Sequence, residues 1–229
     1  MKYLRIIFSI LLIPVALSFI VEFLKISVEL LAKVSIDTVP FWIGLFGYFI
    51  FQVIFSKPLQ TYVFGHELTH AIFGLLSGAK IKSFKVSTGG GSVSLTKTTL
   101  FIALSPYFIP IYTVILIAIY WILSRFWNLE AFNLYFLFAI GFTIAFHISL
   151  TYYAISQGQS DLKQFGVFFS LIFVLIVNCI VLSFVFKIVL PDQINLKSYL
   201  NDSAKGILTI WQTLYIFGNQ LWISFQQTK

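Results

Sequence analysis

The sequence has few charged residues. Only 10% of the 229 residues are charged, while 59% are hydrophobic and the mean hydropathy is +0.95. Soluble domains carry about 25% charged residues. A chain with so few charges cannot cover its own surface in water, so most of its surroundings must be lipid. This excludes a soluble enzyme and a disordered regulator.

Cysteine and clustered positive charge are also scarce. The single cysteine, Cys179, lies in an apolar run, so no internal disulfide can form and a disulfide-stapled secreted scaffold is excluded. The 15 Lys and Arg residues outnumber the 8 Asp and Glu residues but are spread along the chain. We therefore expect no nucleic-acid partner, because binding to phosphates requires basic residues gathered on one surface. The excess positive charge is better explained as orienting the chain in a membrane.

Long apolar runs are abundant, and a membrane-crossing helix needs about 20 such residues. Four runs are long enough, at 4–23, 100–123, 131–155 and 166–190. A fifth run, 41–76, is interrupted by Ser56-Lys57-Pro58. Serine is a good helix N-cap and proline suits a first helical turn, so a second helical piece is predicted to restart there. Ser77-Gly78 then provides a glycine C-cap.

The first run has two interpretations. Lys2 and Arg5 precede an apolar core and residues 16–18 could form a cleavage site, as in a signal peptide. Because the run continues past that site, a retained helix is the better interpretation. The lysines of the 78–99 loop favour a cytoplasmic position for that loop and for the N-terminus. The 125–130 turn would then lie outside and the 157–164 loop inside.

The C-terminal segment, residues 191–229, has the composition of an amphipathic tail. Its 207–225 stretch mixes aromatic and amide side chains: Trp211, Tyr215, Trp222, Gln212, Asn219 and Gln220. Trp and Tyr concentrate at membrane interfaces, which predicts an interfacial helix, although a further crossing stays open. The sequence thus predicts an all-α polytopic membrane protein with five or six transmembrane helices. Residues 1–190 would form a single transmembrane domain; the oligomeric state is undetermined.

The motif that carries chemistry is His66-Glu67-Leu68-Thr69-His70. Two histidines four residues apart lie on one face of a helix and can bind one metal ion. The glutamate between them is then placed to act as a general base, which is the HExxH arrangement of zinc peptidases. Ionisable groups within a membrane are costly and usually functional. We therefore expect a metal site with Zn²⁺ as the cofactor and Glu67 as the catalytic base.

A catalytic zinc usually takes three protein ligands, and two candidates for the third remain. Asp161 is expected at the same membrane depth as the end of the HExxH helix, whereas His147 lies within the 131–155 run. We favour Asp161, which could instead be the N-cap of the last span. If Asp161 is the ligand, His147 could orient the substrate; Gln159 and Asn178 are weaker candidates for supporting the ligands.

The 78–99 loop contains a predicted β-hairpin. Apolar and polar residues alternate on both sides of Gly89-Gly90-Gly91, with Phe84 and Val86 before them and Val93 and Leu95 after. Such a hairpin could pair its edge with an extended substrate, or it could simply connect two helices. Further along, Pro106 and Pro110 interrupt the 100–123 run and are predicted to bend that helix.

Residues 61–169 resemble the site-2-protease-like zinc intramembrane metalloproteases, in a compact bacterial branch. The resemblance is carried by the HExxH motif, the glycine-rich loop, phrases such as VFGHELTHAIFG and LSPYFIP, and a later aspartate. It implies zinc bound by His66, His70 and Asp161, with Glu67 as the base, in a multi-pass protein of the bacterial inner membrane. The segment 157–162, Gln-Gly-Gln-Ser-Asp-Leu, departs from the Leu-Asp-Gly that usually surrounds the family's aspartate, and there is no room for an additional PDZ domain.

These features together predict a zinc-dependent intramembrane endopeptidase that cleaves membrane-spanning protein substrates. Two alternatives use the same residues differently. One is a metal-dependent membrane hydrolase of a lipid or small amide, and the other is a non-catalytic membrane adaptor.

Overall fold

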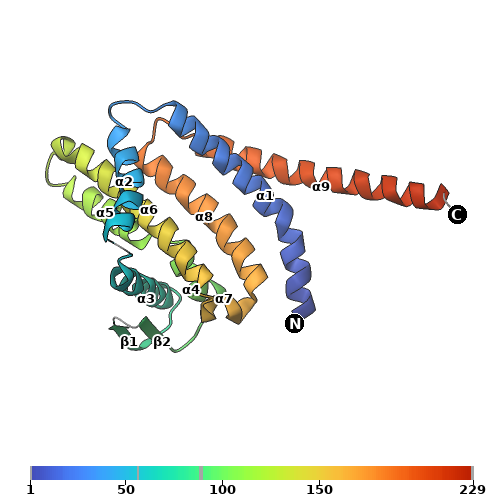
Figure 1. Ribbon diagram of the computed structural model, residues 1–229, viewed down its shortest axis with the longest axis horizontal. Coiled ribbons are helices and arrows are strands. Elements are labelled where there is room, and N and C mark those ends of the chain that lie inside the picture. Colours follow the sequence, from blue (N-terminus) through green and yellow to red (C-terminus); the bar gives the residue numbers. More distant parts are fainter. Residues whose placement is uncertain (1, 56, 88–89, 228–229) are drawn as a thin grey trace. The chain divides into compact units, whose positions relative to one another are not determined.

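The computed structural model describes residues 2–55, 57–87 and 90–227 and is largely helical (Figure 1). The predicted all-α class is therefore confirmed, with one small antiparallel hairpin in the described residues. In chain order the elements are α1 (Lys2–Ala32), α2 (Val39–Phe55), α3 (Leu59–Leu76), β1 (Ile81–Ser87), β2 (Gly90–Leu95), α4 (Leu100–Leu104), the 3₁₀ helix η1 (Ser105–Tyr107), α5 (Ile111–Leu123), the 3₁₀ helix η2 (Glu130–Phe132), α6 (Asn133–Ser156), α7 (Ser160–Phe165), α8 (Val167–Val189) and α9 (Leu196–Gln227).

The chain divides into two compact units. One unit is residues 34–170, and the other combines residues 1–33 with 171–229. All of the HExxH region lies in the 34–170 unit.

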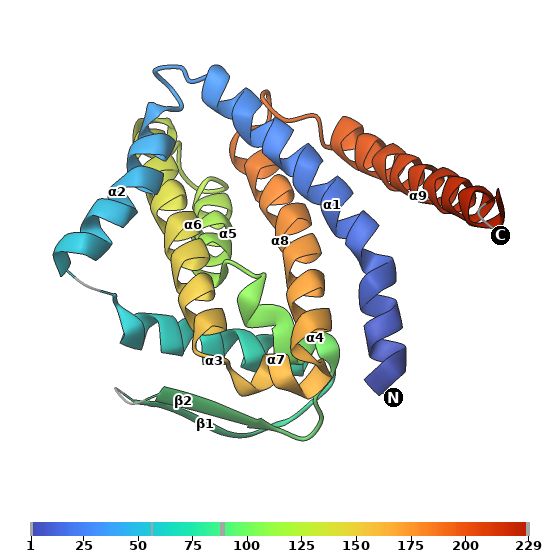
Figure 2. The same cartoon turned by 45° about the vertical axis from the view of Figure 1, so that its right-hand side comes forward.

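Within the 34–170 unit, α2 and α6 pack closely and α5 lies beside α6. The contact between α2 and α6 is tight because glycines face the opposite backbone: Gly44 lies against Phe138, and Gly141 against Phe41. An aromatic cluster around the buried Tyr48 fills the space on the same side. α3 lies across the ends of α2 and α6, and the hairpin lies under α3 (Figure 2).

The other unit is built from α1, most of α8, and α9. Ala16 of α1 packs on Ile172 and Ile176 of α8. The first part of α9 lies along α1, where the Ser18 hydroxyl donates a hydrogen bond to the Ser203 carbonyl oxygen at 2.7 Å.

In the part of the chain that the structure describes, three helical segments are long and apolar enough to cross a membrane: 5–32, 130–156 and 167–189. A fourth crossing is counted if the bent pair 100–107 and 111–123 forms one span. The length and apolar composition of these helices indicate a membrane protein. The number of transmembrane helices, five or six, stays a prediction. The predicted bend of the 100–123 run is confirmed, because the axis turns by 84° between 100–107 and 111–123, at the segment bounded by Pro106 and Pro110.

The predicted restart of the broken 41–76 run is found at α3. Pro58 occupies the N-cap position of α3, whereas it was predicted to lie in the first helical turn. Ser56, the predicted N-cap, lies outside the described residues. At the other end Gly78 has φ +73°, a conformation that glycine adopts without strain, and the Gly78 and Ala79 N–H groups donate to α3 carbonyls. The predicted glycine cap is therefore confirmed.

Candidate metal centre

The HExxH residues occupy the middle of α3. His66 and His70 are one helical turn apart, so their rings project from the same face. Their Nε2 atoms lie 3.2 Å from each other. The third donor comes from α7, where Asp161 Oδ2 lies 3.3 Å from His66 Nε2 and 3.5 Å from His70 Nε2.

These three separations match the geometry of a zinc site. Zinc binds imidazole nitrogen and carboxylate oxygen at about 2.0–2.2 Å in a tetrahedron, whose ligand atoms are then roughly 3.3–3.5 Å apart. Among the described residues, His66, His70 and Asp161 form the group of donor side chains that could hold one metal ion. The donor set therefore fits a tetrahedral cation with one position left for a further ligand.

Hydrogen bonds on the far side of each imidazole point the Nε2 atoms inward. His70 Nδ1 lies 2.8 Å from the Ile102 carbonyl oxygen, which can only accept, so Nδ1 carries the hydrogen. In a neutral His70, Nε2 then has a free lone pair. His66 Nδ1 lies 3.1 Å from the Tyr62 hydroxyl. Partners of this kind fix the tautomer and ring orientation of metal-binding histidines.

Asp161 lies in the first turn of α7, whose N-cap is Gln159. The alternative interpretation, that Asp161 caps the last span, is wrong because α7 separates it from α8 at Val167. The Tyr107 hydroxyl donates to Asp161 Oδ2 at 3.2 Å. Burial by itself would raise the pKa of the carboxyl, but the neighbouring His66 and His70 side chains hold the pKa of Asp161 well below its usual range.

Glu67 is buried beneath strand β2. A Cβ atom at Gly91 would lie 2.6 Å from Glu67 Cγ, so only glycine allows the strand to lie this close. Burial raises the pKa of Glu67, while the nearby His70 and a hydrogen bond from the Val93 backbone act in the opposite direction. The hairpin thus holds the carboxylate in place beside the two histidines.

The predicted hairpin is confirmed, but Gly90 and Gly91, which were expected in its turn, are paired residues at the start of β2. Phe84 pairs with Val93, and Val86 pairs with Gly91, so these four residues share the face that packs on α3. Phe84 contacts Phe64 of α3 in an edge-to-face arrangement. Gly90 and Gly91 line the site, while Gly89 lies outside the described residues.

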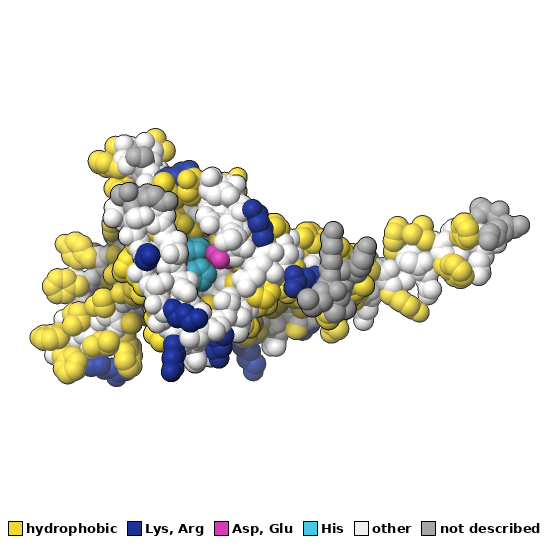
Figure 3. All heavy atoms as spheres, turned by 90° about the horizontal axis from the view of Figure 1, so that it is seen from below, with side chains coloured by type: hydrophobic (Ala, Val, Ile, Leu, Met, Phe, Trp, Pro, Cys, Tyr) yellow, Lys and Arg dark blue, Asp and Glu magenta, His cyan; other side chains and the backbone are white. Residues whose placement is uncertain are grey.

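A pocket of about 420 Å³ opens over these groups. It is lined on one side by α3, on the second by β2 and on the third by residues 159–161. Histidine and acidic side chains are visible together at its floor, and lysine or arginine side chains surround the opening (Figure 3). An extended chain segment could therefore approach the metal-binding side chains from this face.

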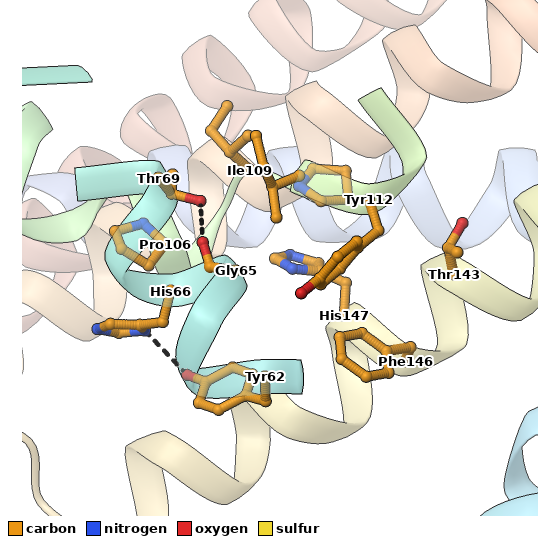
Figure 4. Close-up of a pocket in the computed structure, with 12 residues that line it drawn as sticks. Tyr62, Gly65, His66, Thr69, Pro106, Ile109, Tyr112, Thr143, Phe146 and His147 are labelled. Carbon is orange, nitrogen blue, oxygen red and sulfur yellow. Dashed lines mark hydrogen bonds between the residues drawn. The ribbon is translucent and has the colours of Figure 1, made fainter. Parts of the chain in front are cut away.

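Of the other predicted site residues, one lines this pocket and two lie outside it. His147 on α6 is buried and lines a neighbouring cavity of about 20 Å³, with His66, Gly65 and Tyr112 (Figure 4). It does not belong to the three-donor group. Gln159 lines the metal pocket. Asn178 lies in α8, in the other unit, and its amide donates to the Val174 carbonyl oxygen of the same helix.

The sequence reasoning missed the two tyrosines that contact the donor residues. Tyr62 could have been found, because it lies four residues before His66 and therefore on the same helical face. Tyr107 had no comparable signal, since its contact with Asp161 depends on the bend between α4 and α5.

The resemblance to site-2-protease-like enzymes rests on the motif residues and stays a prediction. Comparison of the chain with protein-family models, with curated proteins and with solved structures finds no match.

Proposed function

We propose that the protein is a zinc-dependent endopeptidase that cleaves membrane-spanning protein substrates. The observation that carries the proposal is the triangle of His66 Nε2, His70 Nε2 and Asp161 Oδ2, with sides of 3.2, 3.3 and 3.5 Å. Glu67, the base of the HExxH pattern, lines the same pocket. Two histidines, a carboxylate and an adjacent glutamate are the residues that metal-assisted hydrolysis requires.

The proposed roles of the side chains follow from their contacts. His66, His70 and Asp161 would hold Zn²⁺, which when bound activates water and polarises a substrate carbonyl. Glu67 accepts the proton of the attacking water and passes it to the leaving amine. Tyr62 and Tyr107 keep His66 and Asp161 in their orientations through hydrogen bonds of 3.1 and 3.2 Å.

Strand β2 supports peptide rather than small-molecule cleavage. It borders the pocket along residues 90–93, and in the described hairpin its sole partner strand is β1. Its other edge can therefore pair with an extended segment of substrate. Extended geometry matters because peptide bonds within a helix are shielded by their neighbours and their own hydrogen bonds.

Charge supports a cytoplasmic position for the site in a bacterial inner membrane. In the 34–170 unit, five exposed lysines lie on the hairpin, its flanking loops and α7: Lys80, Lys82, Lys85, Lys97 and Lys163. Within the described residues none of them forms an ion pair with a carboxylate. Loops rich in lysine are retained in the cytoplasm.

The test compares membranes that contain the wild-type protein with membranes that contain Glu67→Gln or His66→Ala. We expect zinc in the first two proteins and loss of zinc from His66→Ala. New protein termini within membrane-spanning segments, measured by mass spectrometry of total membrane protein, should appear with wild type alone. Identical termini with wild type and Glu67→Gln would overturn the peptidase. Zinc-dependent release of fatty acid or amine without new termini would favour the lipid or amide hydrolase, and absence of zinc would favour the adaptor.

A further inference from the structure

The charged side chains of the 34–170 unit are divided between its two ends. α2 and α6 run in the same direction, because Phe138 of α6 lies against Gly44 near the start of α2, and the Ser149 hydroxyl donates to Gln52 Oε1 at 2.6 Å further along both helices. The unit therefore has one end at which these two helices begin and one end at which they finish.

These two ends differ in charge. The end at which α2 and α6 begin carries Asp37, Arg125 and Glu130, which have both signs. The end at which they finish carries α3, the hairpin and α7 (Figure 2). Five exposed lysines lie at this end, and we call them the lysine rim: Lys80, Lys82, Lys85, Lys97 and Lys163. Residues 34–170 contain four carboxylates, and the two at this end, Glu67 and Asp161, belong to the metal pocket.

Two members of the rim stand beside the walls of that pocket. Lys163 Nζ lies 3.9 Å from the position of a Cβ atom at Gly158, so its ammonium group is next to the wall formed by residues 159–161. Lys85 pairs with Ser92, which lines the pocket, and paired residues present their side chains on the same face of a hairpin. A chain segment that enters the pocket therefore passes positive charge on two sides.

The direction in which the pocket opens favours a protein partner over lipid headgroups. α6 is a candidate membrane span. The floor of the pocket is visible when the unit is viewed from the end at which α6 finishes (Figure 3). Headgroups surround the sides of a spanning helix, whereas this opening faces the aqueous phase beyond its end. The lysine rim is therefore met by a chain that arrives from the aqueous side.

We propose that the lysine rim selects substrates whose chain is acidic next to the cleaved bond. This inference rests on the proposed endopeptidase and on the cytoplasmic position of its site. Opposite charges across an interface attract the right partner, and like charges suppress the wrong ones. The cytoplasmic flanks of membrane-spanning segments carry an excess of lysine and arginine, so the rim repels most of them. The rim thus protects ordinary membrane proteins and admits those with Asp and Glu in this position.

The test measures binding of synthetic single-span peptides to the full chain in the uncharged detergent dodecylmaltoside. The peptides share one apolar span and one flank and differ only in flank positions that are Glu, Gln or Lys. Affinity is measured by fluorescence anisotropy with Glu67→Gln, so that no peptide is consumed, and cleavage is measured separately with wild type. The rim is tested by adding Lys85→Gln and Lys163→Gln, singly and together. Arg125→Gln, at the other end of the unit, is the matched control.

We expect the Glu flank to bind about tenfold more tightly than the Gln flank, since each exposed charge pair contributes roughly 1.4- to 5-fold. The Lys flank should bind more weakly than the Gln flank. These differences should shrink as salt is added, because exposed charges are screened. Lys85→Gln and Lys163→Gln together should reduce the preference for the Glu flank by at least about threefold. Arg125→Gln should leave the preference unchanged.

Equal affinity for the three flanks at low salt would overturn the proposal. An equal loss of preference in Arg125→Gln and in the double lysine variant would also overturn it, because the net charge and not the rim would then be responsible. If flank charge has no effect and phosphatidylglycerol in nanodiscs protects Lys85 and Lys163 from acetylation, the rim binds lipid headgroups instead.

The same measurements separate this proposal from the proposed function. A preference for the Glu flank that depends on the two lysines supports the rim whether or not the peptide is cut. If wild type shows that preference and leaves every peptide intact, the result counts against the endopeptidase alone.

Discussion

Asp161 Oδ2 lies 3.3 Å from His66 Nε2 although 95 positions separate the two residues in the chain. The same oxygen accepts a hydrogen bond from Tyr107 and lies 3.5 Å from His70 Nε2. A single carboxylate, in the first turn of α7, thus connects α7 with the HExxH helix α3 and with the bend after α4.

The first prediction concerns the third ligand. Asp161→Asn replaces a negatively charged donor by a neutral amide, so zinc affinity should fall by more than the roughly 10- to 100-fold that loss of an outer-shell partner costs. His147→Ala should retain zinc, because His147 lies outside the donor triangle. Metal content of the purified variants by mass spectrometry decides between them. Full zinc occupancy in Asp161→Asn would exclude it as a ligand.

The second prediction concerns the tyrosines that contact the donor residues. Tyr62→Phe and Tyr107→Phe keep the ring but remove hydroxyls that lie 3.1 Å from His66 Nδ1 and 3.2 Å from Asp161 Oδ2. We expect zinc affinity to weaken by about 10- to 100-fold in each. Competition with a chelator of known affinity measures this loss. Tyr135→Phe, at an exposed position on α6, is the control and should bind zinc like wild type.

The third prediction concerns the contact between β2 and the base. Gly91→Ala puts a methyl group 2.6 Å from Glu67 Cγ and must displace either the carboxylate or the strand. Cleavage should fall by at least about tenfold, the cost of 1.4 kcal/mol in the barrier, while zinc stays bound. Turnover and metal content are measured on the same preparation. Ser94→Ala, exposed on the same strand, should be active; equal activity of the two variants would show that Gly91 does not position Glu67.

The fourth prediction concerns the packing of α2 on α6. A methyl group at Gly141 would overlap the Phe41 carbonyl oxygen, so Gly141→Ala should destabilise the protein by about 1–3 kcal/mol. The control is Gly47→Ala in α2, where nothing lies within 4 Å of the added Cβ. Alanine is the better helix former, so this variant should be as stable as wild type or slightly more stable. Thermal unfolding in detergent measures both, and an equal melting temperature for the two variants would contradict the proposed contact.

The fifth prediction concerns metal removal. A ligand that binds only the folded chain stabilises it by about 2.7 kcal/mol at a concentration of 100 times Kd. Treatment with 1,10-phenanthroline should therefore lower the melting temperature and abolish cleavage, and added zinc should restore both. His66→Ala should melt at the same temperature with and without the chelator. A chelator effect of equal size in wild type and His66→Ala would place the metal at another site.

The sequence by itself determined the features that depend on near neighbours along the chain. The scarcity of charge fixed lipid as the environment, and the four-residue spacing of His66 and His70 fixed a shared helical face. The alternation around the glycines fixed the hairpin. None of these needs tertiary contacts, since charge content is counted over the whole sequence and the helical and strand periods are read over fewer than about 20 residues.

Only the tertiary structure decided which distant groups meet these local elements. Tyr107 reaches Asp161 because the helix breaks by 84° near Pro106, an angle that the sequence does not specify. Gly91 lies against Glu67 because the hairpin folds under α3. The choice between Asp161 and His147 was open in the sequence because both are normal zinc ligands, and neither depth nor rotation about a helix axis can be read from composition. Packing of α4, α6 and α7 around α3 decided that Asp161 lies beside the two imidazoles.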